Sequence, residues 1–157
     1  MLSQTFFDRN DTDRLQTSYK KFSTISYLTL IIGIPVEVLI GYVASIRIAA
    51  LFWPVALLGL AILLSAYYIV FFKRMKSFRQ DLAEQTKLVG SLRVVSKSEK
   101  DKQLLVSFDS DELKQANLAR AAFDKINIGD ILSVEFSKYA RYIFKMSKGD
   151  DIIINGN

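Results

Sequence analysis

Apolar residues are concentrated in one long block in the N-terminal half of the chain. From Phe22 to Phe72 there are 51 residues, of which only Glu37 and Arg47 are ionisable. One helix crosses a bilayer with about 20 residues, so this block suits two spans and a short turn. We predict a transmembrane hairpin over residues 22–72, with spans over about 23–43 and 54–72.

The helical pattern continues beyond the second span. Apolar residues keep a spacing of three or four from Phe71 to Leu82, with charged and polar residues between them, and no helix breaker occurs before Gly90. Residues 73–86 are therefore predicted to form a helical stalk that ends near Gln85.

A change of period marks a small soluble domain over residues 87–157. Alternating apolar positions predict strands on both sides of Gly90 and over 103–108, 131–136, 142–146 and 151–154. The polar stretch 96–102 predicts a hairpin loop, and the carboxylates of 109–112 predict the start of a helix that runs to about Phe123. The fold class is thus an α+β membrane protein: a hairpin followed by a strand-rich domain, barrel-like or a rolled sheet, with one short helix.

The N-terminal segment, residues 1–21, precedes the apolar block. Residues 1–10 have no clear period, and a helix is predicted from Thr12, with Asp11 or Thr12 as its cap. A signal peptide would have an apolar core of only 7–15 residues, whereas this block begins late and runs far longer. We therefore expect the segment to be retained and to lie at the membrane surface.

The net charge of +5 is explained by basic residues that flank the apolar block. Residues 87–157 hold 12 basic and 10 acidic side chains without a basic stripe, so we predict no nucleic-acid partner. The flanking residues form a juxtamembrane basic collar: Lys20, Lys21, Lys73, Arg74, Lys76 and Arg79. Against this collar the turn holds only Arg47, and the positive-inside rule therefore predicts a multi-pass protein of the inner membrane with both termini in the cytoplasm. Each basic residue near an anionic leaflet contributes about 1 kcal/mol, but a specific lipid site would require a pocket.

The residue types present limit the chemistry of the protein. There is no cysteine or histidine, which excludes disulfides, thiol nucleophiles and the common zinc sites. The carboxylates of 109–112 and of Asp150 and Asp151 are metal-ligand types, but acidic clusters at turns are usually solvated, so we predict no metal and no cofactor. An enzyme that uses carboxylates alone is the least favoured hypothesis.

Small and polar residues follow one face of the first span. These six residues, the helix-contact face, are Ser26, Thr29, Gly33, Glu37, Gly41 and Ser45. Such residues let another helix approach closely, and Glu37 is too costly to leave against lipid. The second span offers Ala61 and Ser65 as a modest match, so a second copy or a foreign helix is predicted to cover the remainder.

Two functions follow from these features. The favoured hypothesis is a non-enzymatic membrane protein, self-associated or joined to a membrane-protein partner, whose cytoplasmic domain is a binding or scaffolding module for protein. The alternative is a small subunit or an oligomeric pore in which Glu37 faces a proton or ion path.

Overall fold

The computed structural model describes residues 2–46, 48–100 and 103–155. The chain divides into two compact units: one combines the residues up to Leu15 with those from Gln80 onward, and the other is Gln16–Arg79. Arg47, on which the predicted orientation depends, lies outside the described residues.

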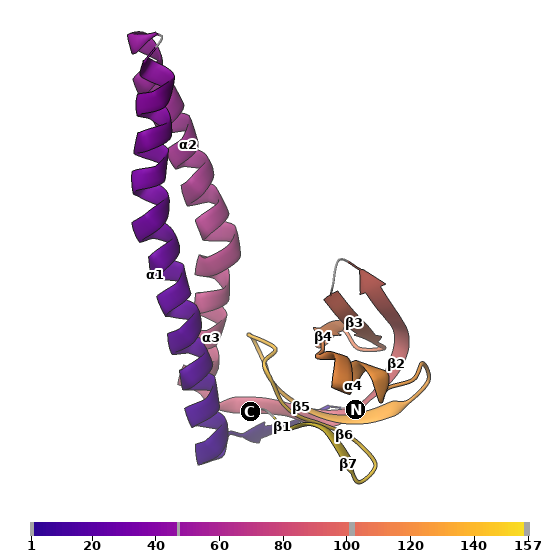
Figure 1. Ribbon diagram of the computed structural model, residues 1–157. Coiled ribbons are helices and arrows are strands. Elements are labelled where there is room, and N and C mark those ends of the chain that lie inside the picture. Colours follow the sequence, from indigo (N-terminus) through magenta and orange to yellow (C-terminus); the bar gives the residue numbers. More distant parts are fainter. Residues whose placement is uncertain (1, 47, 101–102, 156–157) are drawn as a thin grey trace. The chain divides into compact units, whose positions relative to one another are not determined.

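Two long helical stretches account for the apolar block (Figure 1). The first is α1, Arg9–Ser45, which continues unbroken through Pro35. The second follows a 3₁₀ turn and consists of α2, Phe52–Tyr67, a π-helical turn, Tyr68–Phe72, and α3, Lys73–Glu84. Both stretches are long and apolar enough to cross a membrane, and almost none of their most apolar residues are buried.

The start of α1 differs from the prediction. The helix begins at Arg9 and not at Thr12, because Asp8 is the capping residue. The Asp11 N–H donates to Asp8 Oδ1 at 2.7 Å, and the Asp8 N–H donates to Asp11 Oδ2 at 3.2 Å. Reciprocal bonds of this kind satisfy two amides that the first helical turn leaves without partners.

The lack of a clear period over residues 1–10 predicted irregular structure, but part of this segment forms a strand. Strand β1, Ser3–Phe6, pairs antiparallel with the start of β2, Thr86–Lys100. The isolated segment lacks strand periodicity, so its backbone bonds are formed only because the distant β2 presents an edge.

The remaining strands form an open antiparallel sheet. The strands are β3 (Gln103–Phe108), β4 (Gln115–Asn117), β5 (Ile131–Ser137), β6 (Ile143–Lys148) and β7 (Asp151–Asn155). With β1 the sheet has seven strands, in the order β4-β3-β2-β5-β6-β7, and β1 also pairs with β2. The predicted strands over 131–136, 142–146 and 151–154 are confirmed.

Strand β2 joins the two parts of the sheet. Its first half, Lys87–Arg93, pairs with β5, and its second half pairs with β3 after a bulge between Val94 and Ser96. The predicted loop over 96–102 is wrong as far as Lys100, which still pairs with Gln103; residues 101 and 102 lie outside the described residues. Figure 1 shows β3 and β4 on one side of the short helix α4, Arg120–Asp124, and β5 on the other.

One hydrophobic core lies between these two parts of the sheet. It includes Val94 of β2, Val106 of β3, Phe123 of α4, Val134 of β5 and Met146 of β6, and each of these is at least nine-tenths buried. Because the bulged β2 contributes to both parts, the sheet rolls around α4 and encloses this core.

The predicted helix over 109–123 is wrong except at its end. Asp109 accepts the Arg93 N–H at 2.9 Å, which fixes a turn after β3, and the chain then returns as β4. Leu113, Ala116 and Leu118 are buried at a spacing of two or three, as in extended chain. Burial against the core therefore overrides the local helix signal.

Candidate functional site

The helix-contact face of α1 meets the second helix of the same hairpin. The Ser26 hydroxyl, fully buried, donates to the Tyr67 hydroxyl at 2.8 Å. A Cβ on Gly33 would lie 3.0 Å from two methyl carbons of Leu63. A Cβ on Gly41 would lie 3.0 Å from the Ala56 Cβ. The helices therefore approach closely at the small residues, as they do in membrane bundles.

Glu37 occupies a notch that a glycine of α2 leaves open. A Cβ on Gly59 would lie only 2.0 Å from Glu37 Oε2 and 2.8 Å from Glu37 Cδ. Real Cβ atoms do not approach oxygen so closely, so the carboxyl group stands where a side chain of residue 59 would stand. The carboxyl group of Glu37 is thereby placed against α2 at Gly59.

Two members of the predicted face form bonds within α1. The Thr29 hydroxyl donates to the Ile25 carbonyl at 2.9 Å, and the Ser45 hydroxyl donates to the Tyr42 carbonyl at 2.7 Å. Such bonds satisfy a hydroxyl inside an apolar helix without any neighbour.

The predicted counterpart on the second helix is wrong. Ala61 and Ser65 are exposed. The residues that meet α1 are Ala56, Gly59, Leu63 and Tyr67, which share one helical face. Gly59 was the sequence feature that could have predicted this face. It is the single glycine of the predicted second span, and it lies four residues before Leu63, on the same side of the helix. Within the hairpin, α2 contacts all four of Ser26, Gly33, Glu37 and Gly41; it buries Ser26 and Gly41 and leaves Gly33 and Glu37 partly exposed.

Aromatic rings surround the basic collar. All six collar residues are exposed. Arg79 Nε donates to the Tyr19 hydroxyl at 2.9 Å, and the Arg74 guanidinium lies 5.2 Å from the centroid of the Phe22 ring. Phe22 in turn lies 5.4 Å from Phe71. These contacts join α1 to the second stretch through cation–π and ring packing.

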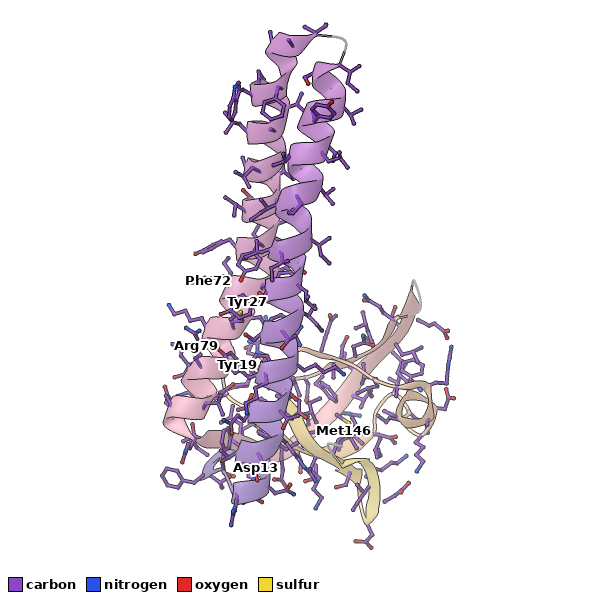
Figure 2. All side chains as sticks on the ribbon, turned by 60° about the vertical axis from the view of Figure 1, so that its left-hand side comes forward. Asp13, Tyr19, Tyr27, Phe72, Arg79 and Met146 are labelled. Carbon is purple, nitrogen blue, oxygen red and sulfur yellow. The ribbon has the colours of Figure 1, made fainter. Side chains whose placement is uncertain are left out.

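A cavity of about 250 Å³ opens in the hairpin beside the collar. Its lining residues are Tyr27, Tyr67, Phe72, Met75, Lys76 and Arg79. Figure 2 shows Tyr27 beside Phe72 and Tyr19 beside Arg79, on facing helices. The sequence analysis had identified the two basic lining residues, Lys76 and Arg79, only as part of the collar. Their spacing of three residues was the available signal, since it puts them on one side of α3.

The β-domain is joined to the ends of the helices by buried polar groups. Asp81 is fully buried, and its two carboxylate oxygens accept the backbone N–H groups of Tyr139 at 2.9 Å and Ala140 at 2.7 Å. Lys87 Nζ bridges Asp11 Oδ2 at 2.6 Å and Glu135 Oε2 at 2.7 Å. Burial alone would lower the pKa of Lys87, but the hydrogen bonds to Asp11 and Glu135 outweigh it and raise that pKa. Sequence reasoning missed these groups because each partner is distant along the chain.

The acidic clusters make local contacts. Asp111 pairs with Lys114 at 3.3 Å, the Ser110 hydroxyl donates to Glu112, and Asp151 pairs with Lys125 at 3.5 Å. In the part of the chain that the structure describes, no group of three or more carboxylates is placed to hold a metal ion.

Exposed apolar side chains gather at one corner of the β-domain. Val95, Ile128 and Ile131 are 54%, 65% and 64% exposed. They surround a turn in which the Gly129 N–H donates to the Val94 carbonyl at 2.9 Å, with Gly129 at a φ of +91° that favours glycine. Hydrogen bonds from Lys148 and from the Asn127 N–H lower the pKa of Asp130, so its carboxyl group stays ionised to lower pH.

Comparison of the chain with protein-family models, with curated proteins and with solved structures gives no match. The function must therefore be inferred from the residues themselves.

Proposed function

We propose that the chain is an integral membrane protein in which the hairpin anchors a non-enzymatic binding module, the β-domain. One observation carries this proposal: the hairpin presents large apolar side chains outward along its length. Ile31, Leu58 and Ile69 are 66%, 64% and 64% exposed. Apolar surface in water costs about 25 cal/mol per Å², and monomeric soluble proteins rarely expose contiguous apolar patches larger than a few hundred Å². A bilayer removes that cost.

Membrane fractionation tests the anchor. The full chain should sediment with membranes, remain there after alkaline carbonate washing and be released by detergent. Release by carbonate, or recovery in the soluble fraction, would contradict insertion. Lys20→Glu/Lys21→Glu serves as a control, because loss of a purely electrostatic attachment would release that variant from the membrane while an inserted hairpin would stay.

The collar supports an orientation with both termini in the cytoplasm. Six exposed bases flank the outer ends of the two apolar stretches, and the positive-inside rule concerns residues near span ends of this kind. A reporter active only in the cytoplasm, fused after the last residue, should be active. A silent fusion would contradict the orientation and its assignment to an inner membrane.

The exposed corner formed by Val95, Ile128 and Ile131 supports a protein partner for the β-domain. A photoreactive amino acid at Ile131 should cross-link a protein in living cells. The same group at Lys145, also exposed on the sheet, is the matched control. Equal cross-linking yields at the two positions would contradict a binding surface at this corner.

The place of Glu37 supports anchoring over conduction. The carboxyl group lies against Gly59 of its own hairpin, which is a packing position. Glu37→Gln, which keeps the shape, should leave ion and proton flux through reconstituted vesicles unchanged from the empty-vesicle level. A proton flux in the wild type that Glu37→Gln removes would instead establish the alternative, an oligomeric path. A self-associated form would use positions other than Ser26 and Gly41, which are buried within the hairpin.

A further inference from the structure

The cavity beside the basic collar has the chemistry of a site for one anionic phospholipid. We propose that Lys76 and Arg79 bind the phosphate of such a lipid while Tyr27, Phe72 and Met75 contact the start of its acyl chains. This inference rests on the proposed function, because it requires the hairpin to lie in a bilayer.

The charge of the lining favours an anion. Lys76 and Arg79 are one helical turn apart, and none of the described lining residues carries a carboxylate. Tyr19 accepts a hydrogen bond from Arg79 Nε at 2.9 Å, which orients the guanidinium. The two terminal nitrogens of the Arg79 guanidinium have no hydrogen-bond partner among the described residues. Two N–H donors in one plane match the geometry of two phosphate oxygens.

The apolar part of the lining favours a lipid over a soluble anion. Met75 is 7% exposed, while Tyr27 and Phe72 are 54% and 50% exposed. The Tyr67 hydroxyl is engaged by Ser26, so the ring is the part of Tyr67 left to face an apolar ligand. A free phosphate ion would make no use of these surfaces, whereas acyl chains would cover them.

The expected depth of Lys76 and Arg79 in a bilayer suits contact with a lipid headgroup. If the hydrocarbon core ends near Phe72, the helical rise places Lys76 about 6 Å and Arg79 about 10 Å beyond it. The polar layer of a bilayer is roughly 5–8 Å thick on each side, so the backbone of Lys76 lies within the headgroup layer and that of Arg79 just beyond it. The long side chain of Arg79 can reach back to the headgroups. The π-helical turn Tyr68–Phe72 ends at this cavity, and turns of that rare kind are frequent at functional sites.

Native mass spectrometry of the full chain in mild detergent tests the site. The probe is an equimolar mixture of dioleoyl phosphatidylglycerol and dioleoyl phosphatidylcholine. We expect the anionic lipid to be bound in preference by about 25-fold, since each of the two bases contributes roughly fivefold. Lys76→Gln/Arg79→Gln should abolish the preference, and Lys76→Gln alone, a change at an exposed residue that leaves the fold intact, should reduce it by about fivefold.

The matched control is Lys20→Gln/Lys21→Gln, which removes the same charge from the same collar but not from the cavity. It should keep the full preference. An equal loss in the two double variants would overturn the proposal in favour of a diffuse attraction to the collar. The absence of any preference, or displacement of the lipid by millimolar inorganic phosphate, would also overturn it. Carbonate extraction of the same preparations separates these results from a failure of membrane insertion, because insertion can hold while lipid selectivity fails.

Discussion

The notch at Gly59 makes the sharpest prediction. Gly59→Ala adds a methyl group 2.0 Å from Glu37 Oε2, and the carboxyl group must retreat by roughly 1.4 Å to reach van der Waals distance. The methyl group itself meets only this flexible side chain within 3.5 Å. The cost of Gly59→Ala should therefore depend on the presence of Glu37.

The magnitude follows from two opposing effects. Moving the carboxyl group away from the helix interface weakens a polar contact, which in membrane bundles contributes about 0.6–1.7 kcal/mol, and it exposes a group that resists lipid contact. Against this, alanine is favoured over glycine in a helix by about 1 kcal/mol. The two effects largely offset each other in the wild-type hairpin, so we expect Gly59→Ala to destabilise it by less than about 1 kcal/mol. In the Glu37→Ala hairpin the same change should stabilise by about 1 kcal/mol, which gives a coupling of about 1–2 kcal/mol.

The assay is reversible unfolding of the full chain in mixed micelles, titrated with a denaturing detergent and followed by helical circular dichroism. Four proteins are compared: the wild type, the two single variants and Gly59→Ala/Glu37→Ala. Gly33→Ala is the matched control, because a Cβ there meets Leu63 and not Glu37. Its effect should be the same with and without Glu37. Equal effects of Gly59→Ala in both backgrounds would refute the placement of the carboxyl group in the notch.

Three further predictions concern other contacts. A Cβ at position 41 would lie 3.0 Å from the Ala56 Cβ, so Gly41→Ile should destabilise the hairpin by about 2 kcal/mol in the same titration. The control Leu39→Ile, at a 60% exposed position, should change the stability by less than about 0.5 kcal/mol. Asp81→Ala leaves the backbone amides of Tyr139 and Ala140 without an acceptor and should cost about 3 kcal/mol. The loss should appear as faster hydrogen exchange in residues 137–142, and unchanged exchange there would contradict the contact. The raised pKa of Lys87 means that its stabilisation is complete below the unfolded-state pKa of about 10.4 and is lost as pH rises through the folded-state pKa. Exchange of β2 should therefore accelerate above about pH 10 in the wild type more than in Lys87→Met, and parallel profiles would count against the ion pairs.

The sequence by itself determined the features that depend on local composition and period. An apolar block of 51 residues predicts two long helices, and these are found as α1 and the stretch from Phe52 to Glu84. The C-terminal strands β5, β6 and β7 were also predictable, since their apolar positions alternate and turn residues separate them. Helical spacing alone also put on one face of α1 the four residues that contact α2: Ser26, Gly33, Glu37 and Gly41.

Only the tertiary structure decided which residues meet across long separations in the chain. Strand β1 exists because β2 offers it an edge, and residues 109–119 form a turn and strand β4 in place of a helix because the core buries Leu113 and Ala116. The helical phase of α2 against α1 places Gly59 at the contact and leaves Ala61 exposed, although both are small residues of the same helix. Asp81 accepts amides 58 and 59 residues away, and the lining of the cavity brings Tyr27 to Arg79. Each of these contacts depends on the relative placement of two elements, and no local pattern of hydrophobic and polar residues carries that information.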